Sequence, residues 1–78
     1  MSEVKADVRV DASGLNCPMP ILKAKKALDS LGAGQVLEFI ATDSGTKADI
    51  PALLKRLGHE LVGSREENGK FIFYIKKI

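Results

Sequence analysis

The sequence predicts an α+β two-layer sandwich, in which two helices cover one face of a four-stranded mixed sheet. The chain has 78 residues, which is enough for one domain and no more. Apolar residues recur with the period of a strand or of a helix in the order β-α-β-α-β-β. Right-handed crossover connections then place both helices on the same side of the sheet. We therefore expect one domain over residues 1–78, with a flexible tail at residues 1–6.

The first element is a short strand. Val8 and Val10 alternate with the charged residues Arg9 and Asp11, and this period of two predicts a strand over about residues 7–12. Serine, glycine and asparagine follow, and these residue types are typical of a loop.

A helix is predicted over residues 18–31. Its apolar residues recur at intervals of three and four, which places them on one face of a helix. This stripe consists of Ile21, Leu22, Ala24, Ala27, Leu28 and Leu31. Pro18 and Pro20 fall in the first turn, where a missing N–H costs no helical hydrogen bond. Gly32 is expected to end the helix in the left-handed conformation.

The next two elements are a strand and a second helix. A mostly apolar run at residues 36–41 predicts a buried central strand. A helix is predicted over roughly residues 47–57 and is closed by Gly58. Either Thr46 paired with Asp49 in a capping box, or Asp49 by itself, would cap the start of that helix.

Two strands joined by a tight turn end the chain. Residues 61–66 form the weaker strand, because Gly63 interrupts the pattern. Apolar residues alternate clearly over residues 71–76, which predicts the last strand. Asn68-Gly69 between the two strands is typical of a hairpin turn.

Composition restricts the class of protein. Twelve basic and ten acidic residues leave a net charge of +2, which is too weak to indicate nucleic-acid binding by itself. One cysteine cannot form an internal disulfide, and this favours an intracellular protein. The first residues do not resemble a signal peptide, and no apolar run approaches the roughly 20 residues of a membrane span. We expect a cytoplasmic protein that makes no contact with membranes and is a monomer, because every predicted element has a place in one sandwich.

The candidate functional residue is Cys17, the only cysteine. It lies where the loop meets the predicted helix N-terminus, and there the helix dipole and free N–H groups stabilise a thiolate. Pro18 and Pro20 stiffen the backbone after the cysteine. Gly14 can adopt the turn geometry that presents it outward. The competing interpretation is a buried, inert cysteine that packs as a small apolar side chain.

The residues around Cys17 resemble the signature of the TusA (SirA-like) sulfur-carrier family. An acidic residue, Gly-Leu, one spacer and then Cys-Pro-x-Pro occur here from Asp11 to Pro20. Ser44 stands where many members have proline, which raises a question about the geometry of the loop around it. The resemblance covers about residues 8–77 and implies a fold like that of the C-terminal domain of translation initiation factor three. Further matching segments are Thr42-Asp43, Asp49-Ile50-Pro51, Gly58-His59-Glu60-Leu61 and the last strand from Gly69 to Lys77.

The resemblance also implies a function. Cys17 would accept sulfane sulfur as a persulfide from a cysteine desulfurase or a rhodanese-like donor, and would pass it to a DsrE-like acceptor. Such a relay would be a sulfurtransferase that serves transfer-RNA thiolation, sulfur oxidation or cofactor sulfuration. A second cysteine nearby would collapse the persulfide to a disulfide, so a single cysteine suits a carrier. No cofactor or metal is expected, because Cys17 and His59, the only histidine, do not make a closed zinc site.

Several other residues are candidates for partner contacts. They are Met19, Lys23, Lys26, Asp43 and Asp49. Met19 could form an apolar rim beside the thiol. The lysines, together with Lys25, could meet an acidic partner or could simply form a solvated helix face. Turn and capping roles explain the two aspartates more simply than a catalytic pair does, and a packing or capping role is the simpler explanation of His59.

Two other functions remain open from the sequence. A nucleic-acid-binding module is one, because the predicted sandwich resembles a ribosome-binding domain. The near-neutral charge and the few aromatic residues argue against it, and RNA binding that survives Cys17→Ser would favour it. A regulatory adaptor without sulfur chemistry is the other. It would keep its partners after Cys17→Ala and would never gain the mass of a sulfur atom.

Overall fold

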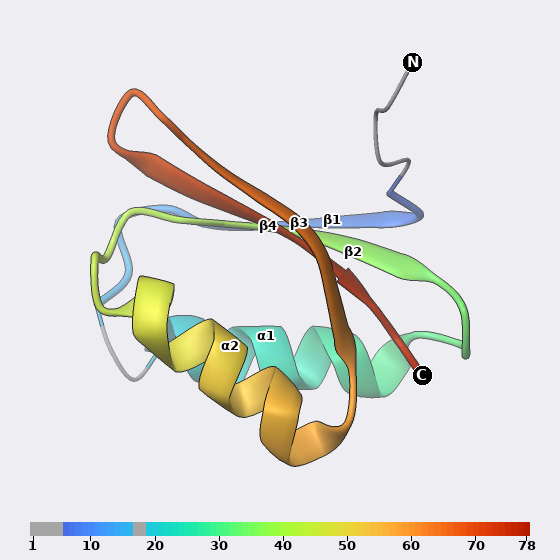
Figure 1. Ribbon diagram of the computed structural model, residues 1–78. Helices are drawn as coiled ribbons and strands as arrows, with labels where there is room; N and C mark the ends of the chain where they lie inside the picture. The colour runs from blue at the N-terminus through green and yellow to red at the C-terminus, as the bar shows by residue number, and fades with distance from the viewer. Residues whose placement is uncertain (1–5, 17–18) are drawn as a thin grey trace.

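Six elements follow one another in the predicted order in the computed structural model, which describes residues 6–16 and 19–78 (Figure 1). They are β1 (Val8–Ala12), α1 (Met19–Ser30), β2 (Val36–Ala41), α2 (Thr46–Leu57), β3 (Glu60–Glu67) and β4 (Lys70–Lys76). The central strand has the bounds that the sequence predicted, and the others differ by one or two residues. Of the described helices, neither is long and apolar enough to cross a membrane.

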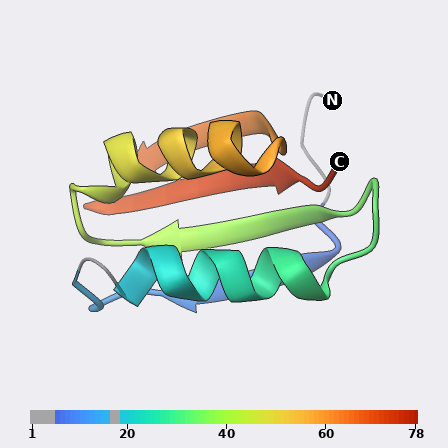
Figure 2. The same ribbon diagram turned by 90° about the horizontal axis from the view of Figure 1, so that it is seen from below.

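The four strands form one mixed sheet in the order β1-β2-β4-β3. β1 and β2 are parallel, whereas β4 runs antiparallel to both β2 and β3. Figure 2 shows α1 over β1 and β2, and α2 over the β4 and β3 half, with both helices on the same face. The predicted two-layer sandwich is therefore confirmed.

The core lies between the sheet and the two helices. Phe39 of β2 is 0% exposed and is paired across the sheet with Val10 of β1 and Phe73 of β4. Leu28 of α1 and Ile50 of α2 are likewise fully buried in this core. Burying a large apolar side chain stabilises a fold by about 1.5–3 kcal/mol. These few side chains therefore supply much of the stability of so small a domain.

The face of the sheet opposite the helices is closed by its own side chains. Ile40 and Ile72 are neighbours on β2 and β4 and are only 4% and 7% exposed. Charged and aromatic residues surround them on the same face, among them Arg9 and Glu38, whose side chains approach to 3.6 Å. An ion pair of this kind, in which the Arg9 side chain is 70% exposed, contributes little stability.

The predicted end of α1 is wrong in detail. Gly32 does not take the left-handed conformation, and the positive φ of 88° belongs to Gly34 instead. The side chain of Gln35 explains the difference, because its Oε1 accepts a hydrogen bond from the Gly32 N–H at 2.7 Å. This bond lets the chain leave the helix without a left-handed residue at that position.

Leu22 is also wrongly assigned to the buried stripe, since its side chain is 55% exposed. The buried positions of α1 are Pro20, Ala24 and Leu28. Leu22 is two residues from both Pro20 and Ala24, and two residues turn a helix by about 200°. It therefore points away from the core, although its apolar character and its spacing from other residues suggested otherwise.

The start of α2 is built by Asp43 rather than by the predicted caps. Gly45 is the N-cap and makes no side-chain capping bond. The Asp43 carbonyl accepts hydrogen bonds from the N–H of Thr46 at 3.0 Å and from its Oγ1 at 2.7 Å, while Asp43 Oδ1 accepts one from the Gly45 N–H at 3.1 Å. The proposed capping roles of Thr46 and Asp49 are thus wrong, and the turn role of Asp43 is confirmed. At the other end, Gly58 closes α2 at φ 81°, as predicted.

The hairpin between β3 and β4 agrees with its sequence signal. Asn68 and Gly69 have φ values of 51° and 78°, and two positive φ angles in succession are what a type I′ turn requires. The register shifts between Leu61 and Gly63, a bulge that accounts for the weaker alternation in this strand.

Candidate functional site

Cys17 and Pro18 of the predicted sulfur site lie outside the described residues. The residues on either side of them define where the site lies. Asn16 precedes them and Met19 begins α1. The Asn16 carbonyl accepts a hydrogen bond from the Met19 N–H at 2.9 Å, and both residues are exposed. The described residues on either side of this pair, Asn16 and Met19, therefore lie at the surface, and Met19 is the first residue of α1.

The loop that leads to the cysteine is held by short hydrogen bonds. The Ser13 N–H donates to Asp11 Oδ1 at 2.9 Å, and the Leu15 N–H donates to the Ala12 carbonyl at 3.2 Å. The Gly14 N–H donates to Thr42 Oγ1 at 2.8 Å. These bonds connect the loop to β1 on one side and to the residue after β2 on the other.

Asp11 braces this loop as a carboxylate. The Ser13 hydroxyl, and after it the Ser13 backbone N–H, lower the pKa of Asp11 from its ordinary value of 3.8. Among the described residues the buried Ser13 Oγ has no hydrogen-bond partner, so the Ser13 hydroxyl acts on Asp11 as a nearby dipole. Because the pKa of the Asp11 carboxyl is lower in the folded state, its carboxylate stabilises the fold at pH values above the unfolded pKa. This stabilisation is lost as the pH falls through the folded pKa. The brace is therefore intact at neutral pH.

The first turn of α1 favours an anion beside it. It contains no acidic residue, so the positive end of the helix dipole is not neutralised from within the turn. Pro20 in this turn is fully buried and anchors the helix start in the core. The predicted role of Pro20, which is to stiffen the backbone after Cys17, stays a prediction.

The start of α2 lies at the same end of the molecule as the start of α1 (Figure 1). Parallel strands β1 and β2 end at one edge of the sheet, so the loops that follow them meet there. A Cβ placed on Gly45 would lie 3.5 Å from Asp43 Oδ1 and 3.7 Å from Asp49 Oδ2, which puts both carboxylates at the start of α2. The structure thus brings Asp43 and Asp49 to the end of the fold where the cysteine loop lies.

The turn before α2 forms with Ser44 in place of the usual proline. The Ser44 carbonyl accepts a hydrogen bond from the Lys47 N–H at 3.2 Å.

A groove runs along the exposed side of α1, and two adjoining hollows form it. One hollow, of about 400 Å³, is lined by Leu15, Met19, Leu22, Lys23 and Lys26. The other, of about 380 Å³, extends to the edge strand and is lined by Val8, Val10, Lys23, Lys26, Ala27 and Ser30. We call this surface the α1 groove. Met19 is 52% exposed within it, and the ion pairs found among the described residues include neither of its lysines.

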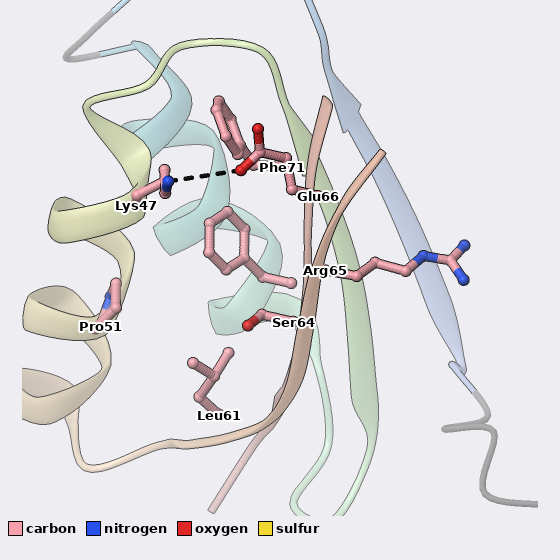
Figure 3. Close-up of a pocket in the computed structure, with 8 residues that line it drawn as sticks. Lys47, Pro51, Leu61, Ser64, Arg65, Glu66 and Phe71 are labelled. Carbon is pink, nitrogen blue, oxygen red and sulfur yellow. Dashed lines mark ion pairs between the residues drawn. The ribbon is translucent and has the colours of Figure 1, made fainter. Parts of the chain in front are cut away.

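A separate hollow of about 250 Å³ lies between α2 and β3 (Figure 3). Lys47 and Glu66 form an ion pair of 3.5 Å across it, and Lys47 Nζ lies 5.4 Å from the centroid of the Phe71 ring. Arg65 points away to the other side of the sheet (Figure 3). The residues that line this hollow come from α2, β3 and β4, so it does not belong to the cysteine loop or to the α1 groove.

His59 lies just after α2 ends, at the opposite end of that helix from Thr46. The imidazole Nδ1 accepts a hydrogen bond from the Ile78 backbone N–H at 3.2 Å. The backbone N–H of His59 donates a hydrogen bond to the Leu54 carbonyl at 3.0 Å. The prediction of a packing or capping role for His59 therefore agrees with the structure.

Comparison with known proteins identifies the family. Residues 8–77 match the family model described as sulfurtransferase TusA. The chain belongs to the TusA family. A sulfur carrier protein TusA of Allochromatium vinosum is 58% identical to this TusA-family chain over 71 residues, which cover 91% of the chain and 93% of the relative. One of Pseudomonas entomophila is 46% identical over 77 residues, which cover 99% and 96%.

A solved structure supports the same assignment. The crystal structure of a SirA-like protein of Desulfitobacterium hafniense superposes with a TM-score of 0.78 at 28% identity, covering 88% of this chain and 95% of that one. The family expected from the Cys17 motif is thus confirmed, together with the fold and the sulfur-carrier class of function.

Several residues of this candidate site were not among the predicted site residues. Leu15 and Leu22 line the α1 groove, and Thr42 binds the loop at Gly14. Leu22 was missed because it was assigned to the core. A sequence signal for Thr42 was present. Thr42 directly follows β2, and the loop that follows the parallel strand β1 lies at the same edge of the sheet.

Proposed function

We propose that this protein carries sulfur as a persulfide on Cys17 between a donor protein and an acceptor protein. The observation that carries the proposal is the place of the only cysteine, two residues before α1 begins, in a chain of the TusA family. A helix N-terminus without an acidic first turn favours the thiolate, which is the nucleophilic form. The exposed neighbours Asn16 and Met19 support access from outside.

The transfer is thiol–disulfide chemistry in two balanced steps. The Cys17 thiolate attacks the outer sulfur of a donor persulfide, so that a new S–S bond forms at Cys17 while the donor S–S bond breaks and the donor leaves as a thiolate. An acceptor thiolate then attacks the outer sulfur of the Cys17 persulfide and releases Cys17 as a thiolate. Neither step needs an external oxidant or reductant.

The partners we propose are a cysteine desulfurase or rhodanese-like donor and a DsrE-like acceptor. Both steps require a reduced thiol, which fits a cytoplasmic setting. The α1 groove offers a partner apolar contacts at Met19 and positive charge at Lys23 and Lys26. Asp43 and Asp49, at the same end of the fold, are proposed as further partner contacts.

Reversing the charge of the groove is expected to slow docking. In the double variant Lys23→Glu, Lys26→Glu, the rate constant for sulfur uptake from a purified cysteine desulfurase should fall by about tenfold, because opposite charges steer association. The measurement is made at about 0.1 M salt, where the Debye length is about 10 Å. Lys55→Glu, at the far end of α2, is the control and should stay within about twofold. Lys25 is unsuitable as a control because it lies on α1 between the two lysines of the groove. Equal rates for the double variant and the control would remove the groove from the proposal.

The decisive experiment is mass spectrometry of the reduced protein after incubation with a cysteine desulfurase and cysteine. We expect a gain of one sulfur atom that a reductant reverses. Addition of a DsrE-like acceptor should then remove the sulfur and leave the carrier reduced. If neither a desulfurase nor a rhodanese-like donor ever adds sulfur, the carrier function is refuted, and retained partner binding would then favour the adaptor function.

A further inference from the structure

One hydrogen bond connects the cysteine loop to a distant part of the chain. The Gly14 N–H donates to Thr42 Oγ1 at 2.8 Å, and the two residues are 28 positions apart in sequence. The other hydrogen bonds described for residues 13–16 have partners within three positions, at Asp11, Ala12 and Met19. Among the described hydrogen bonds of this loop, the one to Thr42 is therefore the bond that ties the loop to the segment after β2.

Thr42 is itself held firmly. It follows Ala41, the fully buried last residue of the central strand β2. It precedes Asp43, whose carbonyl accepts two hydrogen bonds from the buried Thr46. The backbone of Thr42 is thus fixed on both sides. Its hydroxyl is therefore an acceptor with a defined position, which suits it to hold a loop in place.

The bond orients the loop more than it stabilises the fold. Gly14 and Thr42 are both exposed, so water could satisfy the N–H and the hydroxyl if the loop moved away. Gly14 has a φ of 82°, a conformation that turns the backbone sharply just before the cysteine. Losing the bond should therefore free the loop while the sandwich stays folded.

We infer that Thr42 is the positioning residue that holds the Cys17 loop in place for sulfur transfer. The inference rests on the proposed carrier function. A carrier must present the same thiol to two different proteins, and each encounter loses less entropy when the loop is already ordered. A fixed loop also keeps the thiol position constant relative to the N-terminus of α1, on which stabilisation of the thiolate depends.

The test compares two substitutions of one residue. Thr42→Val keeps the shape but removes the acceptor, whereas Thr42→Ser keeps the hydroxyl. Ser44→Ala removes a hydroxyl from the same loop and is the matched control. We measure the pH dependence of alkylation of reduced Cys17 by iodoacetamide, and the rate constant for sulfur uptake from a cysteine desulfurase.

Thr42→Val should take up sulfur about fivefold more slowly, the effect of one lost hydrogen bond, and its alkylation profile should move to higher pH. Thr42→Ser and Ser44→Ala should remain within about twofold of the unmodified protein, and the melting temperature should change little in all three. A Thr42→Val protein with an unchanged alkylation profile and uptake rate would overturn the inference. So would a loss that Thr42→Ser fails to restore.

The two measurements separate this inference from the proposed function. Alkylation needs no sulfur donor. If the unmodified protein never takes up sulfur but Thr42→Val still moves the alkylation profile, the carrier function fails while the positioning role stands. If sulfur uptake occurs and Thr42→Val affects neither measurement, only the positioning role fails.

Discussion

Cys17→Ser is expected to abolish sulfur uptake entirely. Serine differs from cysteine in a single atom, so the change adds no bulk and alters no charge on α1. Its hydroxyl, however, is not ionised at neutral pH and cannot hold sulfane sulfur in an S–S bond. Removing the nucleophile of a covalent mechanism costs on the order of 10⁴-fold or more in rate. The variant should therefore show no gain of a sulfur atom by mass spectrometry under conditions that load the unmodified protein fully.

The control for this variant is its ability to bind. Because the α1 groove does not depend on the sulfur atom, Cys17→Ser should still occupy the donor and slow the loading of unmodified protein in a competition experiment. Its circular dichroism spectrum should match that of the unmodified protein. A sulfur atom found on the Cys17→Ser protein would place the carrier site elsewhere and contradict the mechanism.

Local patterns predicted most of the fold. The strand Val36–Ala41 was predicted with its observed bounds, because a run of strand-forming residues is buried on both sides when it lies in the middle of a sheet. The hairpin turn at Asn68-Gly69 was equally clear, since these two residue types tolerate positive φ. In each case the signal and the structure that it specifies lie within a few residues of each other.

The features that the sequence did not reveal depend on distant residues or on side-chain geometry. The exposure of the Leu22 side chain depends on how α1 is rotated over the sheet, and the apolar character of leucine gave no sign of that rotation. The end of α1 depends on the Gln35 side chain, which removes the need for a left-handed Gly32. The bond from Gly14 to Thr42 joins loops that only the parallel pairing of β1 and β2 brings together.

The same division applies to the candidate site. The Cys17 motif and its place beside a helix N-terminus can be predicted from adjacent residues, and the comparison confirms the family that the motif indicated. The α1 groove could be predicted only in part, because Met19, Lys23 and Lys26 follow one another on the helix whereas Val8 and Val10 come from the edge strand. Partner surfaces that combine two elements require the tertiary structure.

Phe39→Ala is expected to have the largest effect on stability. Phe39 is 0% exposed at the centre of the face covered by the helices. Its partners on the two adjacent strands, Val10 and Phe73, also face the core. Truncating a buried phenylalanine costs about 3–5 kcal/mol. Domains are stable by only about 5–15 kcal/mol, and small domains fall at the low end of that range. A large fraction of the Phe39→Ala protein should therefore be unfolded at room temperature, as measured by urea denaturation followed by circular dichroism.

Ile40→Val is the matched control for this change, because Ile40 is the next residue, is 4% exposed and lies on the opposite face of the sheet. It should cost only about 0.5–1.5 kcal/mol. The two variants should also differ in the reactivity of Cys17. β2 ends just before Thr42, so loosening β2 in Phe39→Ala releases the cysteine loop that Thr42 holds. In Phe39→Ala the alkylation profile of Cys17 should approach that of an unfolded cysteine, with a pKa near 8.5. An unchanged urea midpoint in Phe39→Ala would mean that Phe39 does not lie at the centre of the core.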